Sequence, residues 1–208
     1  MTLCVTVQCV RALTYLEFQG TEKYPDLVFT ANAAVVRGKR AYLANFFHLE
    51  RKGERFYYDR WFKQNGYETT GSQDIAFEGA GDGLWAGHGD DRLFSGVGPR
   101  TDVRVLEKLA FELKDGRPFK VIGCRLIDPR FYHIDTCFCP VGPELALYYP
   151  HAFDAITVHN LKNEIELIPV SEREASKFAC NSVAVGKNVV MPAGNDETAK
   201  ALTDRGYN

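Results

Sequence analysis

The chain has 208 residues, of which 45% are hydrophobic and 12% aromatic, enough for one sizeable buried core. The formal net charge is −2 without a run of five like charges, so neither nucleic acid nor an anionic membrane is favoured as a partner. No apolar stretch approaches the roughly 18 residues of a membrane span, and the N-terminus lacks the basic region of a signal peptide. We therefore expect a single domain over 1–208 that binds a small molecule or a protein.

One pattern recurs four times along the chain. An aromatic residue and a small polar cluster come first, then an apolar strand, a turn containing glycine and a second strand. The instances begin 48, 55 and 46 residues apart, at Phe29, Phe77, Tyr132 and Phe178. Recurrence at such a spacing is typical of repeated supersecondary units. The alternative is that four short hairpins resemble one another by chance.

Helices are expected over four segments that follow the hairpins: 50–66, 101–113, 171–179 and 196–206. Thr101 is the expected N-cap of the second helix. Ser171 and Glu174 have the spacing of a capping box in the third. Gly66 and Gly206 are placed to end the first and the last helix.

Short extended segments after the helices complete a β-β-α-β unit. Such units cannot bury their apolar faces alone, so we expect them to pack around a common axis. After the last helix a further strand is expected, yet the sequence stops at Asn208.

Polar side chains stand where the first strand of each unit begins, and in a radial arrangement these strand ends would converge. They are Asn32, Glu78, Asp82, His133, Asp135 and Asn181. Buried carboxylates without a basic neighbour in sequence need a cationic partner, which a ligand guanidinium or ammonium could supply. For Glu78 and Asp82 the alternative is hydrogen bonding to the amides of their own glycine-rich turn, EGAGDG.

The segment RFYHIDTCFCP, residues 130–140, combines a histidine, a carboxylate and two thiols. On a strand, His133, Asp135, Cys137 and Cys139 would share one face, which permits a general acid–base site. The alternative is a structural histidine in the core, hydrogen-bonded to Asp135 or to the backbone. A zinc site is disfavoured because no second pair of ligands stands at short spacing, and C-x-C is not the redox spacing. We therefore expect no metal and treat both cysteines as small buried hydrophobes.

Six cysteines follow no regular spacing: Cys4, Cys9, Cys124, Cys137, Cys139 and Cys180. In a chain of this length the pattern favours a reduced protein with buried thiols over a disulfide framework. Without a targeting signal, the expected location is the cytoplasm.

Two arginines, Arg51 and Arg100, follow strand pairs at places where loops would surround a central site. The planar guanidinium of arginine suits bidentate binding of a carboxylate. On sequence alone, exposure to solvent is the simpler interpretation of both.

Five segments together resemble the guanidino-group-modifying, or pentein, superfamily, and within it the dimethylarginine dimethylaminohydrolase-like and arginine dihydrolase proteins. The segments are PDLVFTANA (25–33), FEGAGD (77–82), DPRFYHIDTCFCP (128–140), LYYPHAFD (147–154) and FACNSVAVG (178–186). The match runs from about residue 24 to residue 208. It implies an α/β fold, a five-bladed propeller of ββαβ units around a central site, which this chain would form incompletely.

The resemblance also implies a reaction. In the family a cysteine thiolate attacks the guanidinium carbon of an arginine-like substrate, and water hydrolyses the covalent amidino intermediate. Carried onto this chain, His133 matches the acid–base residue and Glu78 the catalytic carboxylate that grips the guanidinium. The substrate-binding residues would be Asn32, Asp135, Asp82, Arg51 and Arg100, with the two arginines on the substrate α-carboxylate. No cofactor is implied, and a homodimer is compatible with the resemblance.

Two departures from the family pattern bear on activity. Asn32 stands where arginine deiminases carry Asp, which resembles the arginine dihydrolase branch, whose products are ornithine, ammonia and carbon dioxide. The family nucleophile lies in a C-terminal segment like G-G-x-x-[RK]-C-L-T, which this sequence lacks, and residues 1–23 match poorly. We expect a chain shortened at both ends that is either part of a guanidino hydrolase or a non-catalytic binder or inactive fragment.

Overall fold

The structure, a computed structural model, describes residues 3–5, 14–16 and 22–208. Cys9 and most of the expected lead-in over 1–23 lie outside the described residues. Within them, β1 (Leu3–Val5) and β2 (Thr14–Leu16) form an antiparallel pair.

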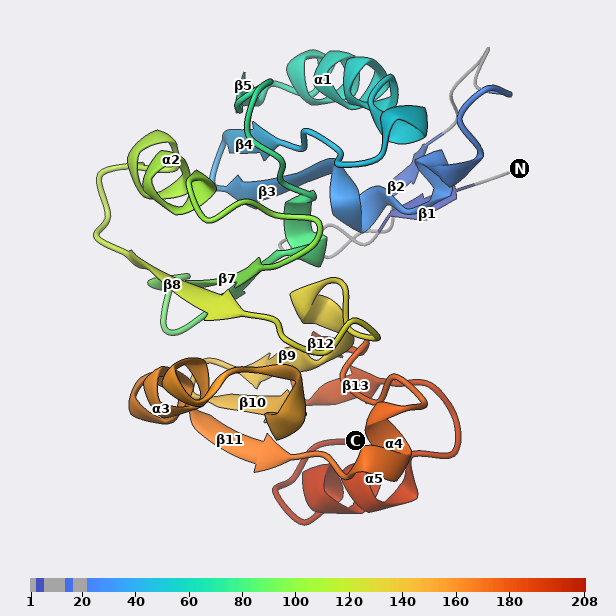
Figure 1. The fold of residues 1–208 in the computed structure, drawn as a ribbon, viewed down its shortest axis with the longest axis vertical. Coiled ribbons are helices and arrows are strands. Elements are labelled where there is room, and N and C mark those ends of the chain that lie inside the picture. The colour runs from blue at the N-terminus through green and yellow to red at the C-terminus, as the bar shows by residue number, and fades with distance from the viewer. Residues whose placement is uncertain (1–2, 6–13, 17–21) are drawn as a thin grey trace.

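Three consecutive segments have the predicted ββαβ order, and in Figure 1 they follow one another from the blue end to the orange. The position predicted for the third helix, 171–179, is wrong, because the helix of the third segment spans Ala155–Glu164. In each, the first two strands are antiparallel and the third pairs parallel with the second. Unit 1 contains β3 (Ala34–Arg37), β4 (Arg40–Leu43), α1 (Glu54–Gln64) and β5 (Glu68–Thr70). Unit 2 contains β6 (Gly83–Ala86), β7 (Arg92–Val97), α2 (Val105–Glu112) and β8 (Lys120–Arg125). Unit 3 contains β9 (Phe138–Gly142), β10 (Leu145–Tyr148), α3 (Ala155–Glu164) and β11 (Glu166–Pro169).

Unit 4 contains β12 (Val183–Val185), β13 (Asn188–Val190) and α5 (Asp196–Thr203). Beyond α5 the backbone of Asn208 donates to Lys187 O at 2.7 Å and accepts from Val189 N at 2.8 Å. The same backbone bond opens the third strand of unit 3, where Glu166 N donates to Glu144 O at 3.0 Å. Asn208 therefore lies where the first residue of the predicted third strand belongs.

The described residues form five sheets of two or three strands each, and none of these sheets closes on itself. The result is a mixed α/β fold with short hairpins and covering helices. Figure 1 shows α1, α2, α3 and α5 toward the outside of the molecule, each beside the sheet of its own unit.

Buried apolar side chains form three clusters. The largest joins units 2, 3 and 4 and includes Phe94, Phe138 and Leu161. A second fills unit 1 beneath α1. The third lies between units 1 and 2, where Tyr42 of β4 packs with residues of β7 and α2. The units are thus packed on one another, as the recurrence predicted.

The helix cap expected at Thr101 is wrong, whereas Ser171 lies at the N-cap position of its helix but its hydroxyl donates to Glu197 at 3.0 Å instead of capping. The helix α2 begins at Val105, and the Thr101 hydroxyl donates to Asp82 at 2.7 Å. In α4 (Glu172–Ala175) the side chain of Ser171 makes no capping bond. The fully buried Glu174 accepts bonds from Glu197 N at 2.9 Å and Thr198 N at 2.8 Å, so it caps α5.

A buried arginine ties unit 1 to unit 2. Only 1% of Arg37 in β3 is exposed, and its guanidinium lies 4.2 Å from the Phe119 ring centroid and 5.4 Å from that of Trp85. It donates to Arg117 O at 3.1 Å and Pro118 O at 3.3 Å. The carbonyls and rings it holds all belong to unit 2, so the contact fixes the relative position of the two units.

We expect Arg37→Met to reduce the free energy of unfolding by about 2–4 kcal/mol, because two carbonyls lose their donors and the ion pair of Arg37 with Asp115, at 3.2 Å, is broken. Urea unfolding followed by circular dichroism measures this change. Arg104→Met is the control, since Arg104 is exposed and bonds only to Asp102 among the described residues. Equal effects of the two substitutions would contradict a tie between units.

Candidate functional site

Short 3₁₀ turns bring the polar residues to the starts of the first strands. Asn32 lies in η2 (Thr30–Ala33), Glu78 immediately precedes η4 (Gly79–Gly81), and His133 immediately precedes η5 (Ile134–Thr136). The turns of neighbouring units touch through side chains. Asn32 Nδ2 donates to Glu78 O at 3.3 Å, and Asn181 Nδ2 donates to Asp135 O at 3.2 Å. The predicted convergence of the strand heads is confirmed.

Glu78 is fully buried and collects three donors from three units. Its Oε1 accepts from Phe47 N at 3.1 Å, and its Oε2 lies 3.0 Å from Arg100 Nη1 and 2.8 Å from His133 Nε2. Burial alone would raise the pKa of Glu78, but the bond to His133, with the Phe47 amide and the Arg100 charge, holds it below its usual value. The Glu78 carboxylate therefore does not bind the amides of its own turn. The cation that it was expected to need is the guanidinium of Arg100, not a group of a ligand.

Asp82 is buried beside Glu78 but bonds to neutral donors. Its carboxylate accepts from the Thr101 hydroxyl at 2.7 Å and from Ile134 N at 3.0 Å. His133 Nε2 lies 3.9 Å away. Burial raises the pKa of Asp82 to about 6, against the opposing effects of His133 and of both hydrogen bonds. The carboxyl group therefore changes its charge within the physiological range.

His133 is the hub of these contacts and only 5% exposed. Burial would lower its pKa, but the hydrogen bond to Glu78 and the charges of Asp82 and Asp135 raise it above the ordinary value. These contacts therefore favour the protonated imidazole over the neutral one.

The turn at His133 also corrects the expected geometry of this segment. Residues 134–136 form η5 rather than a strand, so His133 and Asp135 are not on one strand face. The half-buried Asp135 carboxylate takes part in no hydrogen bond or ion pair within the described part of the chain. Burial and, more weakly, Asp82 raise its pKa to about 7, while His133 opposes this.

Arg51 is buried rather than exposed, and its guanidinium is fully engaged. It donates to both Glu54 oxygens at 2.9 and 2.8 Å and to Asn32 Oδ1 at 3.1 Å. It also reaches Asp26 O at 3.3 Å. Since Glu54 is itself fully buried, this pair orients the carboxamide of Asn32, whose nitrogen then points at Glu78.

Arg100 is also less exposed than expected, but it makes fewer hydrogen bonds than Arg51. Its side chain is 21% exposed, and its one hydrogen bond to described residues goes to Glu78. The guanidinium lies 5.1 Å from the ring centroid of Tyr132, which is itself half exposed and meets His133 edge-on at 5.0 Å. Exposed Phe29 and Phe47 lie beside Arg51 and Glu78, so aromatic rings border the polar cluster.

Glycines permit the close approach of the turns. A Cβ at Gly81 would come within 2.4 Å of Asn32 Nδ2, and one at Gly96 within 2.5 Å of Asp82 Oδ1. The backbone of unit 2 could not otherwise approach these side chains.

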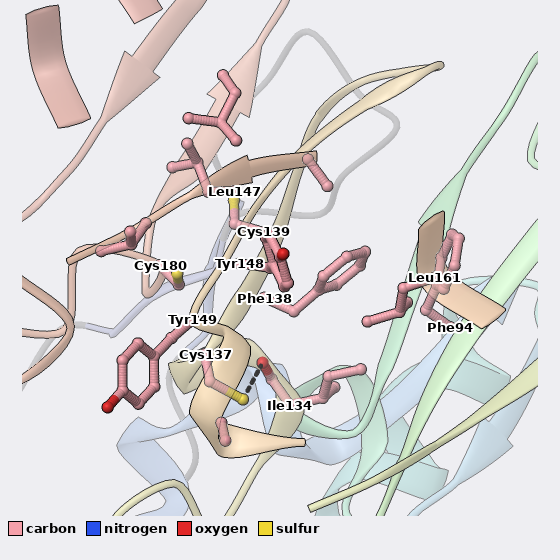
Figure 2. Packing of buried hydrophobic residues seen from close by; sticks show 14 of the residues in the cluster. Phe94, Ile134, Cys137, Phe138, Cys139, Leu147, Tyr148, Tyr149, Leu161 and Cys180 are labelled. Atoms are coloured by element: carbon pink, nitrogen blue, oxygen red, sulfur yellow. Dashed lines mark hydrogen bonds between the residues drawn. The ribbon is translucent and has the colours of Figure 1, made fainter. Parts of the chain in front are cut away.

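The four described thiols are free and buried. Figure 2 shows Cys137, Cys139 and Cys180 among apolar side chains, with Cys137 donating to Ile134 O at 3.5 Å. Burial raises the pKa of Cys139 to about 12 and raises the pKa of Cys124, Cys137 and Cys180 as well. Thiols in this state are poor nucleophiles, in agreement with their predicted place in the core.

Among the described residues, no three His, Cys, Asp or Glu side chains are arranged to hold a metal ion. None of the helices described is long and apolar enough for a membrane crossing. A cavity of about 550 Å³ beside α1 is lined by Arg55, Asp59 and Lys63 but by no predicted site residue.

Thr101, Glu54 and Tyr132 belong to the cluster but were not predicted as part of it. Thr101 was assigned to a helix cap because its spacing fits one equally well. Glu54 stands three residues after Arg51 and could have been found as an i,i+3 ion pair. Nothing in the sequence signals the role of Tyr132, which depends on where Arg100 folds.

The histidine lies buried between carboxylates, next to an asparagine and an arginine, as the resemblance to guanidino-group-modifying proteins implies. The model of the N,N-dimethylarginine dimethylhydrolase family, described as eukaryotic, matches residues 14–205. The chain belongs to this family.

Relatives of known name agree. The chain is 41% identical over 188 residues to the bifunctional arginine dihydrolase/ornithine cyclodeaminase AgrE of Nostoc sp., covering 88% of this chain and 26% of that protein. It is 35% identical to the N(G),N(G)-dimethylarginine dimethylaminohydrolase of Mycobacterium tuberculosis, covering 88% and 58%. The crystal structure of the product-bound N-terminal domain of ArgZ, a cyanobacterial arginine dihydrolase, matches with a TM-score of 0.84 at 39% identity, covering 89% of this chain and 68% of that one. The chain thus spans 26–65% of the length of the first curated relatives it matches.

The dimethylarginine dimethylaminohydrolase of Pseudomonas aeruginosa, in complex with citrulline, matches with a TM-score of 0.76. It covers 89% of this chain and 69% of that one, and at 20% identity it shows a shared fold.

Asp135→Asn should stabilise the protein more at alkaline than at acidic pH. The folded-state pKa of Asp135, about 7, lies above its ordinary value of about 4, so its burial lowers the stability progressively between these two pH values and by a constant amount above pH 7. We expect a gain in melting temperature of roughly 3–6 °C at pH 8 and a clearly smaller gain near pH 5. Differential scanning fluorimetry at both pH values measures it, and a gain of the same size at pH 5 would contradict the assigned cause.

The four buried thiols should resist alkylation in the native protein. Iodoacetamide treatment followed by peptide mass spectrometry reports each cysteine separately. Modification is expected at Cys124, Cys137, Cys139 and Cys180 only after unfolding in denaturant, because thiolate formation requires their exposure. Rapid labelling of Cys137 in the native protein would contradict its assignment as a buried, unreactive thiol.

Proposed function

We propose that this chain forms part of a hydrolase acting on the guanidino group of arginine or a methylated arginine. The observation that carries the proposal is the Glu78–His133 pair, a buried carboxylate 2.8 Å from a histidine whose pKa is raised. Family membership and the arginine dihydrolase names of its relatives support it.

In the proposed site Glu78 binds the guanidinium, and Asp82 and Asp135 add negative charge. His133 protonates the departing amine and then accepts a proton from the attacking water. Arg100 serves the α-carboxylate end, whereas Arg51, which is already bound to Glu54, Asn32 and Asp26, orients Asn32. Asn32 favours the arginine dihydrolase branch of the family, because its amide gives the guanidinium a hydrogen-bond partner without charge.

The covalent step of this proposal needs a cysteine thiolate. None of the four described thiols suits it, since all are buried with raised pKa values. The nucleophile would therefore be another thiol. The competing proposal is a non-catalytic binder, for which the carboxylate cluster alone suffices.

The architecture proposed with this function is a five-bladed propeller of ββαβ units, of which residues 1–208 form one domain. The four units and the touching turns between them support it. Free thiols are consistent with the cytoplasm. A homodimer is a further proposal, which analytical ultracentrifugation would test.

Calorimetry with L-arginine and dimethylarginine, together with product analysis for ornithine, citrulline and ammonia, tests the function. We expect Glu78→Gln to weaken arginine binding at least about tenfold, because a charge-assisted pair is lost. Glu107→Gln, on the exposed face of α2, is the matched control. Unchanged binding in Glu78→Gln would refute the guanidinium site, and binding without turnover in the intact protein would favour the binder.

Binding of arginine should strengthen as pH rises from about 5 to 8. Asp82 and Asp135, with pKa values of about 6 and about 7, become negatively charged over this range and attract the cation. Calorimetric titrations across the range measure the trend. Asp135→Asn should flatten its upper part, and a profile falling with pH would contradict the assignment.

A further inference from the structure

The cavity of about 550 Å³ beside α1 lies in unit 1, apart from the polar cluster around Glu78. One face of α1 contributes Arg55, Asp59 and Lys63, which follow one another at intervals of four residues and therefore point to the same side of the helix. The rest of the lining comes from β4, β5 and the chain beside them and includes Leu43, Asn45, Thr69, Thr70, Gly71 and Gln73. A volume of this size is typical of sites for small molecules.

The same turn of chain supplies residues to the cavity and to the polar cluster, but they are different residues. Lys52 and Arg55 line the cavity. Arg51 and Glu54 bind each other, and Arg51 also binds Asn32. The cavity is therefore a separate site.

Positive side chains predominate in the lining of this cavity. Lys52, Arg55 and Lys63 carry positive charge, and Asp59 is the one acidic residue among those that line it. Asp59 is already engaged, since its carboxylate accepts from Lys63 at 2.8 Å and from the Thr69 hydroxyl at 2.7 Å. The lining thus has an excess of two positive charges.

Arg55 holds one of these charges at a fixed place. Its Nη1 donates to Ala44 O at 2.7 Å and Ser72 O at 3.2 Å, and its Nη2 donates to Gly71 O at 3.0 Å. Carbonyls do not neutralise the charge, and burial lowers the pKa of Arg55 against the opposing effect of Asp59. Neither Arg55 nor the exposed Lys52 forms an ion pair within the described part of the chain, so a bound anion would be their counter-ion.

An apolar surface accompanies the charges. Phe56 also lines the cavity, although its side chain is 66% exposed. A ligand with both an anionic and a carbon part would cover this ring and contact the two unpaired cations at the same time.

We infer that this cavity binds a small organic dianion, a phosphate monoester or a dicarboxylate, through Lys52 and Arg55, with the carbon part of the ligand against Phe56. A charge of −2 on the ligand matches the excess on the lining. The inference goes beyond the proposed function and does not depend on it, because none of these residues belongs to the guanidinium site.

Calorimetric titration of the intact protein at low ionic strength, with glycerol 3-phosphate and with succinate, tests the inference. Lys52→Gln should weaken binding of the tighter probe about fivefold, because an unpaired cation is lost. Asp59→Asn should strengthen it about fivefold, because the one acidic group of the lining is lost while Lys63 is freed. The two effects have opposite signs, which a general loss of structure cannot produce.

Lys108→Gln is the matched control, since Lys108 is exposed on α2 and its loss changes the net charge by the same amount. Equal weakening in Lys52→Gln and Lys108→Gln, or unchanged binding in Asp59→Asn, would overturn the site. Failure of both probes to bind the wild type would overturn it too, with no consequence for the guanidinium site. Tighter binding of glycerol 3-phosphate would assign the cavity to phosphate monoesters, and tighter binding of succinate would assign it to dicarboxylates.

Discussion

The burial of the Glu78 carboxylate is the constraint on which the arrangement of the units depends. An unpaired buried carboxylate costs several kcal/mol, so its donors must be in place when the protein folds. They are the amide of Phe47 in unit 1, the guanidinium of Arg100 in unit 2 and the imidazole of His133 before unit 3. A shift of any unit would break one of these contacts. The polar site therefore helps to define the packing that holds it.

A buried ion pair between Arg51 and Glu54 supports the Glu78 site from its outer side. Another N–H group of Arg51 donates to the Asn32 side-chain oxygen, so that the Asn32 side-chain nitrogen faces Glu78. Removing one partner of such a pair strands a charge in the interior. The orientation of Asn32 is consequently set by residues that need not touch a ligand.

Local regularities of the sequence predicted the ββαβ units and the polar heads of their strands, because alternation, glycine turns and recurrence are short-range properties. Several errors concern long-range partners. Thr101 had the form of a helix cap but bonds to Asp82, and Glu174 caps the next helix rather than its own. Arg100 suggested solvent exposure because its carboxylate, Glu78, lies 22 residues away. Other errors are local: the turn at 134–136, the helix α3 and the i,i+3 pair of Arg51 with Glu54 were not predicted. Which of several suitable partners a side chain meets is decided by packing, which a single sequence does not display.

The three carboxylates of the site show how that packing sets function. Glu78 has three donors, two of them able to carry positive charge, and its pKa lies below the usual value. Asp82 has two neutral donors and a pKa of about 6, and Asp135 has no donor among the described residues and a pKa of about 7. The pKa rises as compensation falls, because burial penalises the charged form throughout. Negative charge that the protein leaves uncompensated is charge that a bound cation would stabilise, which supports the proposed guanidinium ligand.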